Sequence, residues 1–84
     1  MHLEILTPKA ALYSDDILVV KLPGAKGSFE ILKNHAPIIS SLVKGIVEGK
    51  DIAGKAFKFE VGGGVVECKD NKIIVLTTEV FTTL

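Results

Sequence analysis

The chain has 84 residues, with ten basic and ten acidic side chains that bring its formal net charge to zero. This length predicts one small domain spanning residues 1–84. The balanced charge argues against nucleic acid as the main partner, because a phosphate backbone requires a basic face. Apolar residues make up 48% of the sequence, which is ample for a core. A domain of this size buries only about 60–65% of its unfolded surface, so we expect a marginal stability that a partner would raise.

The sequence carries no sign of membrane insertion or secretion. No apolar run reaches the ~20 residues that a membrane-spanning helix needs. Residues 1–4 lack the basic region that opens a signal peptide. The single cysteine, Cys68, has no partner for an internal disulfide, which fits a reducing compartment.

The first quarter of the chain predicts two strands. Residues 2–5 alternate between polar and apolar side chains, the period of a strand with one buried face, and Thr7-Pro8 ends this strand. Residues 9–13 fit either a turn or the start of a strand, and residues 14–16 indicate a bulge or kink. Residues 17–22 are rich in β-branched side chains and apolar on both faces until Lys21. Such a strand is either central in a sandwich or partly covered by another subunit.

Proline and glycine divide the stretch from residue 22 to residue 45 into short pieces. Pro23-Gly24 predicts a tight turn, since proline presets φ and glycine tolerates a positive φ. The spacing then predicts a strand over residues 28–32, a polar loop over 33–37, and a strand over 38–43 that ends near Gly45.

The middle of the chain predicts a hairpin. Residues 46–48 continue the next strand, Gly49-Lys50-Asp51 has the composition of a hairpin tip, and Gly54 marks another bend. Residues 57–61 show the cleanest alternation in the chain. Their apolar members should therefore face the core, and these are Phe57, Phe59 and Val61.

The last third predicts two more turns. Gly62-Gly63-Gly64 allows a sharp turn, after which residues 65–68 would pair back on the preceding strand. Asp70-Asn71 predicts a second turn, and residues 73–77 predict the last strong strand. Residues 80–84 show no pattern that assigns them to an element.

Taken together, these elements predict an all-β fold. No window shows apolar residues at helical spacing over 10–12 residues. Short strands recur about every 8–12 residues with turn signals between them, which is typical of a sandwich or barrel. We therefore expect a small β-sandwich of short, mostly antiparallel strands.

The sequence lacks the residue constellations of an enzyme. Gly62-Gly63-Gly64 has neither the lysine nor the Ser/Thr of a phosphate loop, and a strand follows it instead of a helix. The histidines, His2 and His35, lie far from each other and from Cys68, so they make a poor metal-ligand set. No serine or cysteine has a base and an orienting acid in a recognisable pattern. We expect no catalytic residues, no cofactor and no metal.

The sequence also has more apolar positions than one core face requires. Pairs such as Ile38-Ile39 and Ile73-Ile74 place apolar side chains on both faces of a strand. Either the two sheets are central and mutually buried, or one face is exposed for docking.

Three segments carry a resemblance to a known family: PGAKGSFEILKNHAPIISSLVKGIV from Pro23, FEVGGGVVE from Phe59 and NKIIVL from Asn71. In this order and spacing they resemble the epsilon subunit of F-type ATP synthases, and the resemblance covers nearly the whole chain. It implies the β-sandwich of the family's amino-terminal domain, without the carboxy-terminal helical domain of longer members.

The resemblance further implies a non-catalytic subunit of the central stalk of a proton-translocating ATP synthase. Such a subunit binds the gamma subunit and the ring of c subunits, and it couples rotation of the c ring to ATP synthesis. It is associated with the membrane only through the complex, at the cytoplasmic face of the bacterial plasma membrane.

The resemblance also assigns contact residues. Thr7, His35 and Ser40 fall at positions that face gamma in the family, although a solvated loop histidine that hydrogen-bonds backbone equally explains His35. Lys33 and Glu30 depart from the proline and glycine of many members, which would make the loop less stiff and add an acid near the ring. The turn that meets the c ring in the family corresponds to Pro23, Gly24, Ala25, Lys26, Gly27 and Ser28.

A rival hypothesis is a free-standing β-sandwich that binds a small ligand or a peptide. It requires a concave apolar pocket with a few converging polar groups.

Overall fold

The computed structural model describes residues 1–83, with the backbone alone for Thr82 and Thr83. This part of the chain is built from strands and contains no helix, so no helix in it is long and apolar enough to cross a membrane. The strands are β1 (His2–Leu6), β2 (Ala11–Leu22), β3 (Phe29–Leu32), β4 (Ile38–Asp51), β5 (Ala56–Lys69), β6 (Lys72–Thr77) and β7 (Val80–Thr83).

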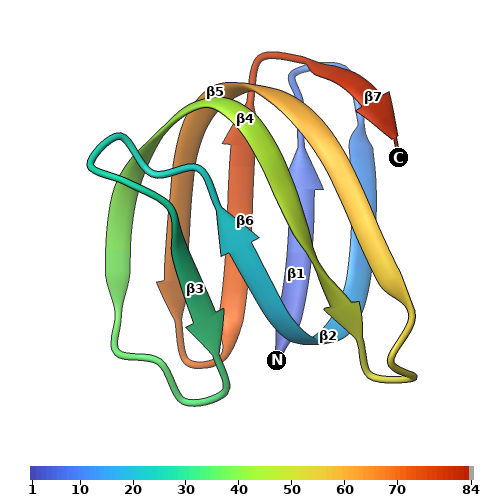
Figure 1. Ribbon diagram of the computed structural model, residues 1–84, viewed down its shortest axis with the longest axis vertical. Coiled ribbons are helices and arrows are strands. Elements are labelled where there is room, and N and C mark those ends of the chain that lie inside the picture. Colours follow the sequence, from blue (N-terminus) through green and yellow to red (C-terminus); the bar gives the residue numbers. More distant parts are fainter. Residues whose placement is uncertain (84) are drawn as a thin grey trace.

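The strands form one sheet that closes on itself (Figure 1). Their order is β1-β6-β5-β4-β2-β3, β2 also pairs with β1, and β7 pairs with β5. The β1–β6 pair is parallel and the other pairs are antiparallel. The predicted all-β, mostly antiparallel sandwich is confirmed, in a closed, barrel-like form.

The three long strands β2, β4 and β5 bend, so each contributes to two layers (Figure 1). We call the first the β1 layer: it contains β1, β6, the start of β2, the start of β4 and the end of β5. The second, the β3 layer, contains β3, β7 and the remaining halves of the long strands. Because the same strands run through both layers, the layers are covalently and hydrogen-bond linked along their length.

The core lies between the two layers and follows the strand period of two. Phe59 is 6% exposed and Val61 is fully buried, whereas Lys58, directly before Phe59, is exposed, which confirms the predicted register of this strand. Phe57 is only partly buried, and its ring lies 4.9 Å from that of Tyr13 between centroids. The fully buried aliphatic residues come from both layers and are Leu3, Ile5, Val20, Leu22, Ile31, Val47, Val61, Val66, Ile73 and Val75.

The prediction of a turn at Gly62-Gly63-Gly64 is wrong. Strand β5 continues through these residues, with positive φ angles of 94° at Gly63 and 146° at Gly64. A Cβ atom at Gly64 would overlap the carbonyl oxygen of Leu76 on β6. The glycines therefore let a paired strand bend and approach its neighbour closely, and the chain does not reverse.

Two further predictions, a strand end near Gly45 and a hairpin tip at Gly49-Lys50-Asp51, are also wrong. Gly45 does not end a strand, because β4 runs from Ile38 to Asp51 without interruption. Gly49-Lys50-Asp51 belongs to this strand, and the hairpin turn follows it at residues 52–55, where the predicted bend at Gly54 is confirmed by a φ of 83°. The Asp51 carboxylate accepts hydrogen bonds from the Ala53 and Lys55 amides at 2.9 Å, which fixes the turn there.

The irregularity of β2 also lies further along than predicted. Residues 14–16 pair regularly with β1, and the register shift occurs between Ile17 and Val19, which turns Leu18 outward with 51% exposure. The Asp70-Asn71 turn is confirmed, with φ angles of 52° and 60°. The unassigned tail forms β7 along β5, and Leu84 lies outside the described residues.

Candidate interaction surface

The outer side of the β1 layer carries exposed apolar side chains on neighbouring strands. In one row across the strands, Leu6 lies opposite Leu76 and Leu76 lies opposite Val65. In the next row, Ile74 and Ile39 lie on either side of β5. Ile39 is 75% exposed, Leu76 52% and Val65 39%. We call the five residues Leu6, Ile39, Val65, Ile74 and Leu76 the apolar face.

The apolar face bears on whether the surplus apolar residues are mutually buried between two sheets or exposed for docking. Ile73 is fully buried between the layers, whereas Ile74 and Ile39 point to the outer side. Mutual burial of two sheets therefore does not account for the surplus, because part of it is exposed. Exposed apolar side chains on neighbouring strands of a small domain favour the docking explanation.

The residues assigned to gamma by resemblance border this layer but do not meet. Thr7 follows β1 at one end of the layer, and His35 precedes β4 at the other (Figure 1). Ser40 lies on β4 opposite Val66, whose side chain is buried, so Ser40 faces inward and its neighbour Ser41 faces outward. The role of each of these residues at a gamma interface stays a prediction.

Hydrogen bonds give two of these residues a local role. The Thr7 hydroxyl accepts from the amides of Lys9 and Ala10 at 3.3 and 3.2 Å, which closes the β1–β2 turn. The His35 Nδ1 lies 2.7 Å from the carbonyl oxygen of Ala36, as expected for a loop histidine that hydrogen-bonds backbone.

A pair of asparagines, which the sequence did not reveal, holds the loop that carries His35. The Asn34 amide donates to Oδ1 of Asn71 at 2.7 Å, and Nδ2 of Asn71 donates to Oδ1 of Asn34 at 3.0 Å. The Asn71 carbonyl also accepts from the His2 amide at 2.9 Å. Both asparagines have positive φ, which asparagine tolerates better than most residues. These bonds link the β3–β4 loop to the β5–β6 turn and to the start of β1.

The observed tight turn lies within the segment that the resemblance assigns to the c ring, but it begins at Gly24 and not at Pro23. The Gly27 amide donates to the Gly24 carbonyl at 3.0 Å, so the turn spans Gly24 to Gly27. Pro23 and Gly24 are buried, and the Pro23 carbonyl accepts from the Val43 amide at 2.9 Å. Of the predicted set, Pro23 and Gly24 thus anchor the loop on β4, and the four exposed members are Ala25, Lys26, Gly27 and Ser28.

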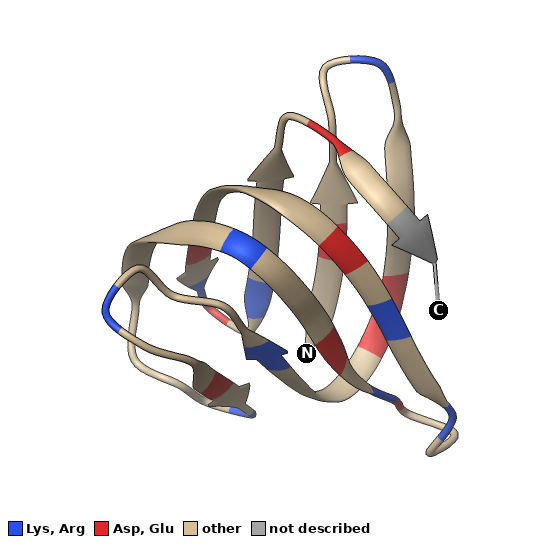
Figure 2. Ribbon diagram, turned by 45° about the horizontal axis from the view of Figure 1, so that its top comes forward, with Lys and Arg blue, Asp and Glu red and all other residues tan. Residues whose placement is uncertain are grey.

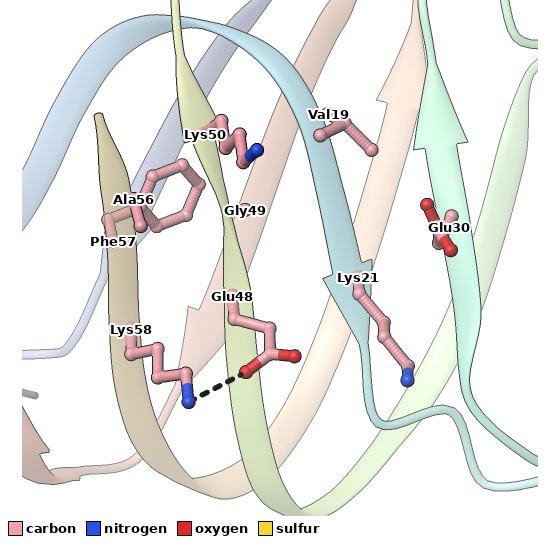
Figure 3. A pocket seen from close by; sticks show the side chains of 9 residues that line it. All are labelled: Val19, Lys21, Glu30, Glu48, Gly49, Lys50, Ala56, Phe57 and Lys58. Carbon is pink, nitrogen blue, oxygen red and sulfur yellow. Dashed lines mark ion pairs between the residues drawn. The ribbon is translucent and has the colours of Figure 1, made fainter. Parts of the chain in front are cut away.

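The outer side of the β3 layer differs from the apolar face in carrying a full row of charged side chains, although Leu32 is also exposed there. Glu30, Lys21, Glu48 and Lys58 alternate in sign along one row, and Lys58 lies 3.5 Å from Glu48 (Figure 3). Acidic and basic positions are interspersed along the strands (Figure 2). The hollow on this side is lined largely by these charged residues. It does not meet the description of the concave apolar pocket that a ligand-binding sandwich requires.

A polar cluster that the sequence did not suggest lies at the start of β1. His2 Nδ1 is 2.9 Å from Oδ1 of Asp16, and His2 Nε2 is 3.0 Å from Oγ of Ser14. The order acid–imidazole–hydroxyl is that of a nucleophilic triad. Ser14 and Asp16 are exposed on a strand face, however, and neither is among the residues that line five of the best-formed hollows in residues 1–83. The cluster therefore forms a polar border of the β1 layer.

Cys68 should be chemically inert in the folded state. Its side chain is 1% exposed, and burial raises the pKa of its thiol, so less of the reactive thiolate forms at neutral pH. Labelling with a maleimide should be slow in buffer and fast in denaturant, when followed by mass spectrometry. Fast labelling of the native protein would show that the thiol is accessible.

No group of three potential metal ligands occurs in residues 1–83.

A family model for the ATP synthase delta/epsilon chain, β-sandwich domain, matches residues 1–83. Among curated relatives, the ATP synthase epsilon chain of Pelotomaculum thermopropionicum is 45% identical over 75 residues, which cover 89% of this chain and 55% of that protein. The epsilon chain of Chlorobaculum tepidum is 38% identical over 78 residues, which cover 93% of this chain and 89% of that protein. The chain thus spans about half the length of the first relative and most of the second.

Solved structures show the same fold. A chain of the Euglena gracilis mitochondrial ATP synthase superimposes with a TM-score of 0.87 at 18% identity, over 94% of this chain and 51% of that one. A chain of the Tetrahymena thermophila mitochondrial ATP synthase central stalk and c ring gives 0.75 at 20% identity, over 96% and 65%. The family model and the relatives agree with these folds, and this chain belongs to the family of ATP synthase delta/epsilon chains, whose β-sandwich domain it contains.

Proposed function

We propose that this protein is the non-catalytic, epsilon-type subunit of the central stalk of a proton-translocating F-type ATP synthase. In this role it binds the gamma subunit and the c ring, and it couples ring rotation to ATP synthesis. Its place would be the cytoplasmic face of a bacterial plasma membrane, held there through the complex. The observation that supports this proposal most is an exposed apolar face on a chain of this family.

The apolar face suits the gamma contact. Its residues lie on neighbouring strands of one sheet, so a partner of matching shape would bury several aliphatic side chains at once. Thr7 and the loop of His35 border it at its two ends, which is consistent with the positions that the family resemblance gives them.

The exposed turn at residues 25–28 suits the ring contact, because all four of its residues are exposed and none belongs to the apolar face. It adjoins the edge of that face, since the Ala25 amide donates to the carbonyl of Ser41, which lies opposite Val65. Both contacts are carried by one closed sheet with a fully buried core, which deforms little under load. Such a body can transmit torque from ring to stalk.

Co-expression with the gamma subunit of the same organism tests the proposal. We expect the full chain and gamma to co-purify as a stable complex through size-exclusion chromatography. A gamma subunit that folds and elutes without this chain would contradict the proposal.

The ring contact makes a separate prediction. Lys26→Glu combined with Ser28→Asp should leave the fold intact, because both residues are in an exposed turn. Gamma binding should persist, but proton-driven ATP synthesis in reconstituted vesicles should fall. The reason is that charge repulsion introduced at an interface weakens binding more than the loss of one favourable contact does. Normal synthesis by the doubly substituted subunit would show that this turn carries no ring contact.

A further inference from the structure

One acidic residue stands inside the apolar face. Glu67 on β5 lies opposite Ile39 of β4 on one side and opposite Ile74 of β6 on the other. Residues directly opposite each other in a sheet point to the same side, so the carboxylate stands between two isoleucines. Glu67 is exposed, as Ile39 is.

No cation lies within ion-pair distance of the Glu67 carboxylate in the described part of the chain, although Lys69 and Lys72 line a hollow beside it. The ion pairs within 4.0 Å among residues 1–83 are His2–Asp16, Lys58–Glu48 and Lys72–Glu4, and Glu67 is in none of them. The contrast with Glu4 is direct, because Glu4 occupies the same row as Glu67 and pairs with Lys72 at 3.6 Å. The apolar face thus holds a carboxylate without an ion-pair partner in this chain.

Two shallow hollows flank this carboxylate. One lies between β4 and β5 and the other between β5 and β6, and Glu67 and Lys69 line both. A partner side chain that enters either hollow passes close to Glu67. The remaining lining residues are Pro37, Ile38, Ile39 and Cys68 in the first and Asp70, Lys72 and Ile74 in the second.

A partner that covers Ile39 and Ile74 also removes Glu67 from water. A carboxylate that loses its hydration without gaining a cation or hydrogen bonds is strongly destabilising. We infer that the gamma subunit places one basic side chain, an arginine or a lysine, against Glu67 within an otherwise apolar contact. This inference rests on the proposed function and adds the residue that determines specificity, because Glu67 disfavours a partner that presents only apolar or acidic groups there.

The affinity of the full chain for the gamma subunit of the same organism tests this, by calorimetric titration at low and high salt. Glu67→Gln keeps the shape of the side chain and should weaken binding about 10- to 100-fold, as expected for loss of a hydrogen bond to a charged group. The variant should also show a smaller salt dependence than the wild type. Glu67→Lys should bind more weakly still.

Glu30→Gln is the matched control, because it removes the same charge from an exposed strand position on the β3 layer. It should bind gamma as the wild type does. Equal weakening by Glu30→Gln and Glu67→Gln would point to general attraction between charges and would overturn the inference.

Two further outcomes separate this inference from the proposed function. If Glu67→Gln binds at wild-type affinity while Leu76→Asp does not bind, the apolar face docks gamma without a cation at Glu67, and only the inference fails. If the wild-type chain does not bind gamma at all, both the proposed function and the inference fail.

Discussion

Gly64→Ala should be one of the most destabilising single substitutions in this domain. The new methyl group would overlap the backbone of Leu76, and alanine would occupy a φ of 146° that L-residues rarely adopt. Steric overlap costs about 1–3 kcal/mol and a sparsely populated backbone conformation costs about 1–3 kcal/mol more, so the free energy of unfolding should fall by about 2–6 kcal/mol. For a domain of this size this corresponds to a melting temperature lower by roughly 10–45 °C, measurable by circular dichroism.

Gly54→Ala is the control for this prediction. Gly54 also has a positive φ, of 83°, but a Cβ atom there meets nothing within 4 Å. The control therefore carries the backbone cost without the overlap, and it should lower the free energy of unfolding by about 1–2 kcal/mol. If the two substitutions have equal effects, the close approach of β5 and β6 is not the reason that Gly64 must be a glycine.

Leu76→Asp should abolish measurable binding to the gamma subunit while the domain stays folded. Leu76 lies in the middle of the apolar face, between Leu6 and Val65, and is already 52% exposed in the free chain. A buried charge at the centre of an apolar contact costs at least about 3 kcal/mol, which is more than a 100-fold loss of affinity. Calorimetric titration with gamma measures the affinity, and the circular dichroism spectrum reports the fold.

Leu32→Asp provides the comparison, since Leu32 is a strand leucine of similar exposure, 57%, on the β3 layer. Its replacement should change gamma binding by less than about threefold, as for surface positions outside a contact. If both variants lose binding equally, the apolar face is not the docking surface. If neither does, gamma binds elsewhere on the chain.

The sequence by itself determined the features that depend on neighbours along the chain. Alternation from Phe57 to Val61 set which side chains face the core, because side chains alternate sides in any strand. Asp70-Asn71 set a turn, because these residues adopt positive φ at low cost. The all-β class followed from the absence of helical spacing, and the family followed from three motifs in order.

Glycine-rich positions were decided by the tertiary structure. Three consecutive glycines permit both a chain reversal and a sharply bent strand, because glycine has access to both sets of backbone angles. The choice at Gly62-Gly63-Gly64 was made by strands far away in sequence, since β4 and β6 pair with β5 on either side of the bend. The same reason places the hairpin turn after Gly49, whose missing Cβ leaves space for the backbone of β2 at Val19.

The sequence alone also did not show which side chains of the apolar face point to solvent. Ile38-Ile39 is apolar on both faces, and only the pairing of β4 with β5 shows that Ile39 points to solvent. The same parity turns Ser40 inward and Ser41 outward, because a shift of one residue exchanges the two faces of a strand. Glu67 becomes notable only when Ile39 and Ile74 are placed beside it. Local pattern fixes where strands are, and long-range pairing decides which face each strand presents to a partner.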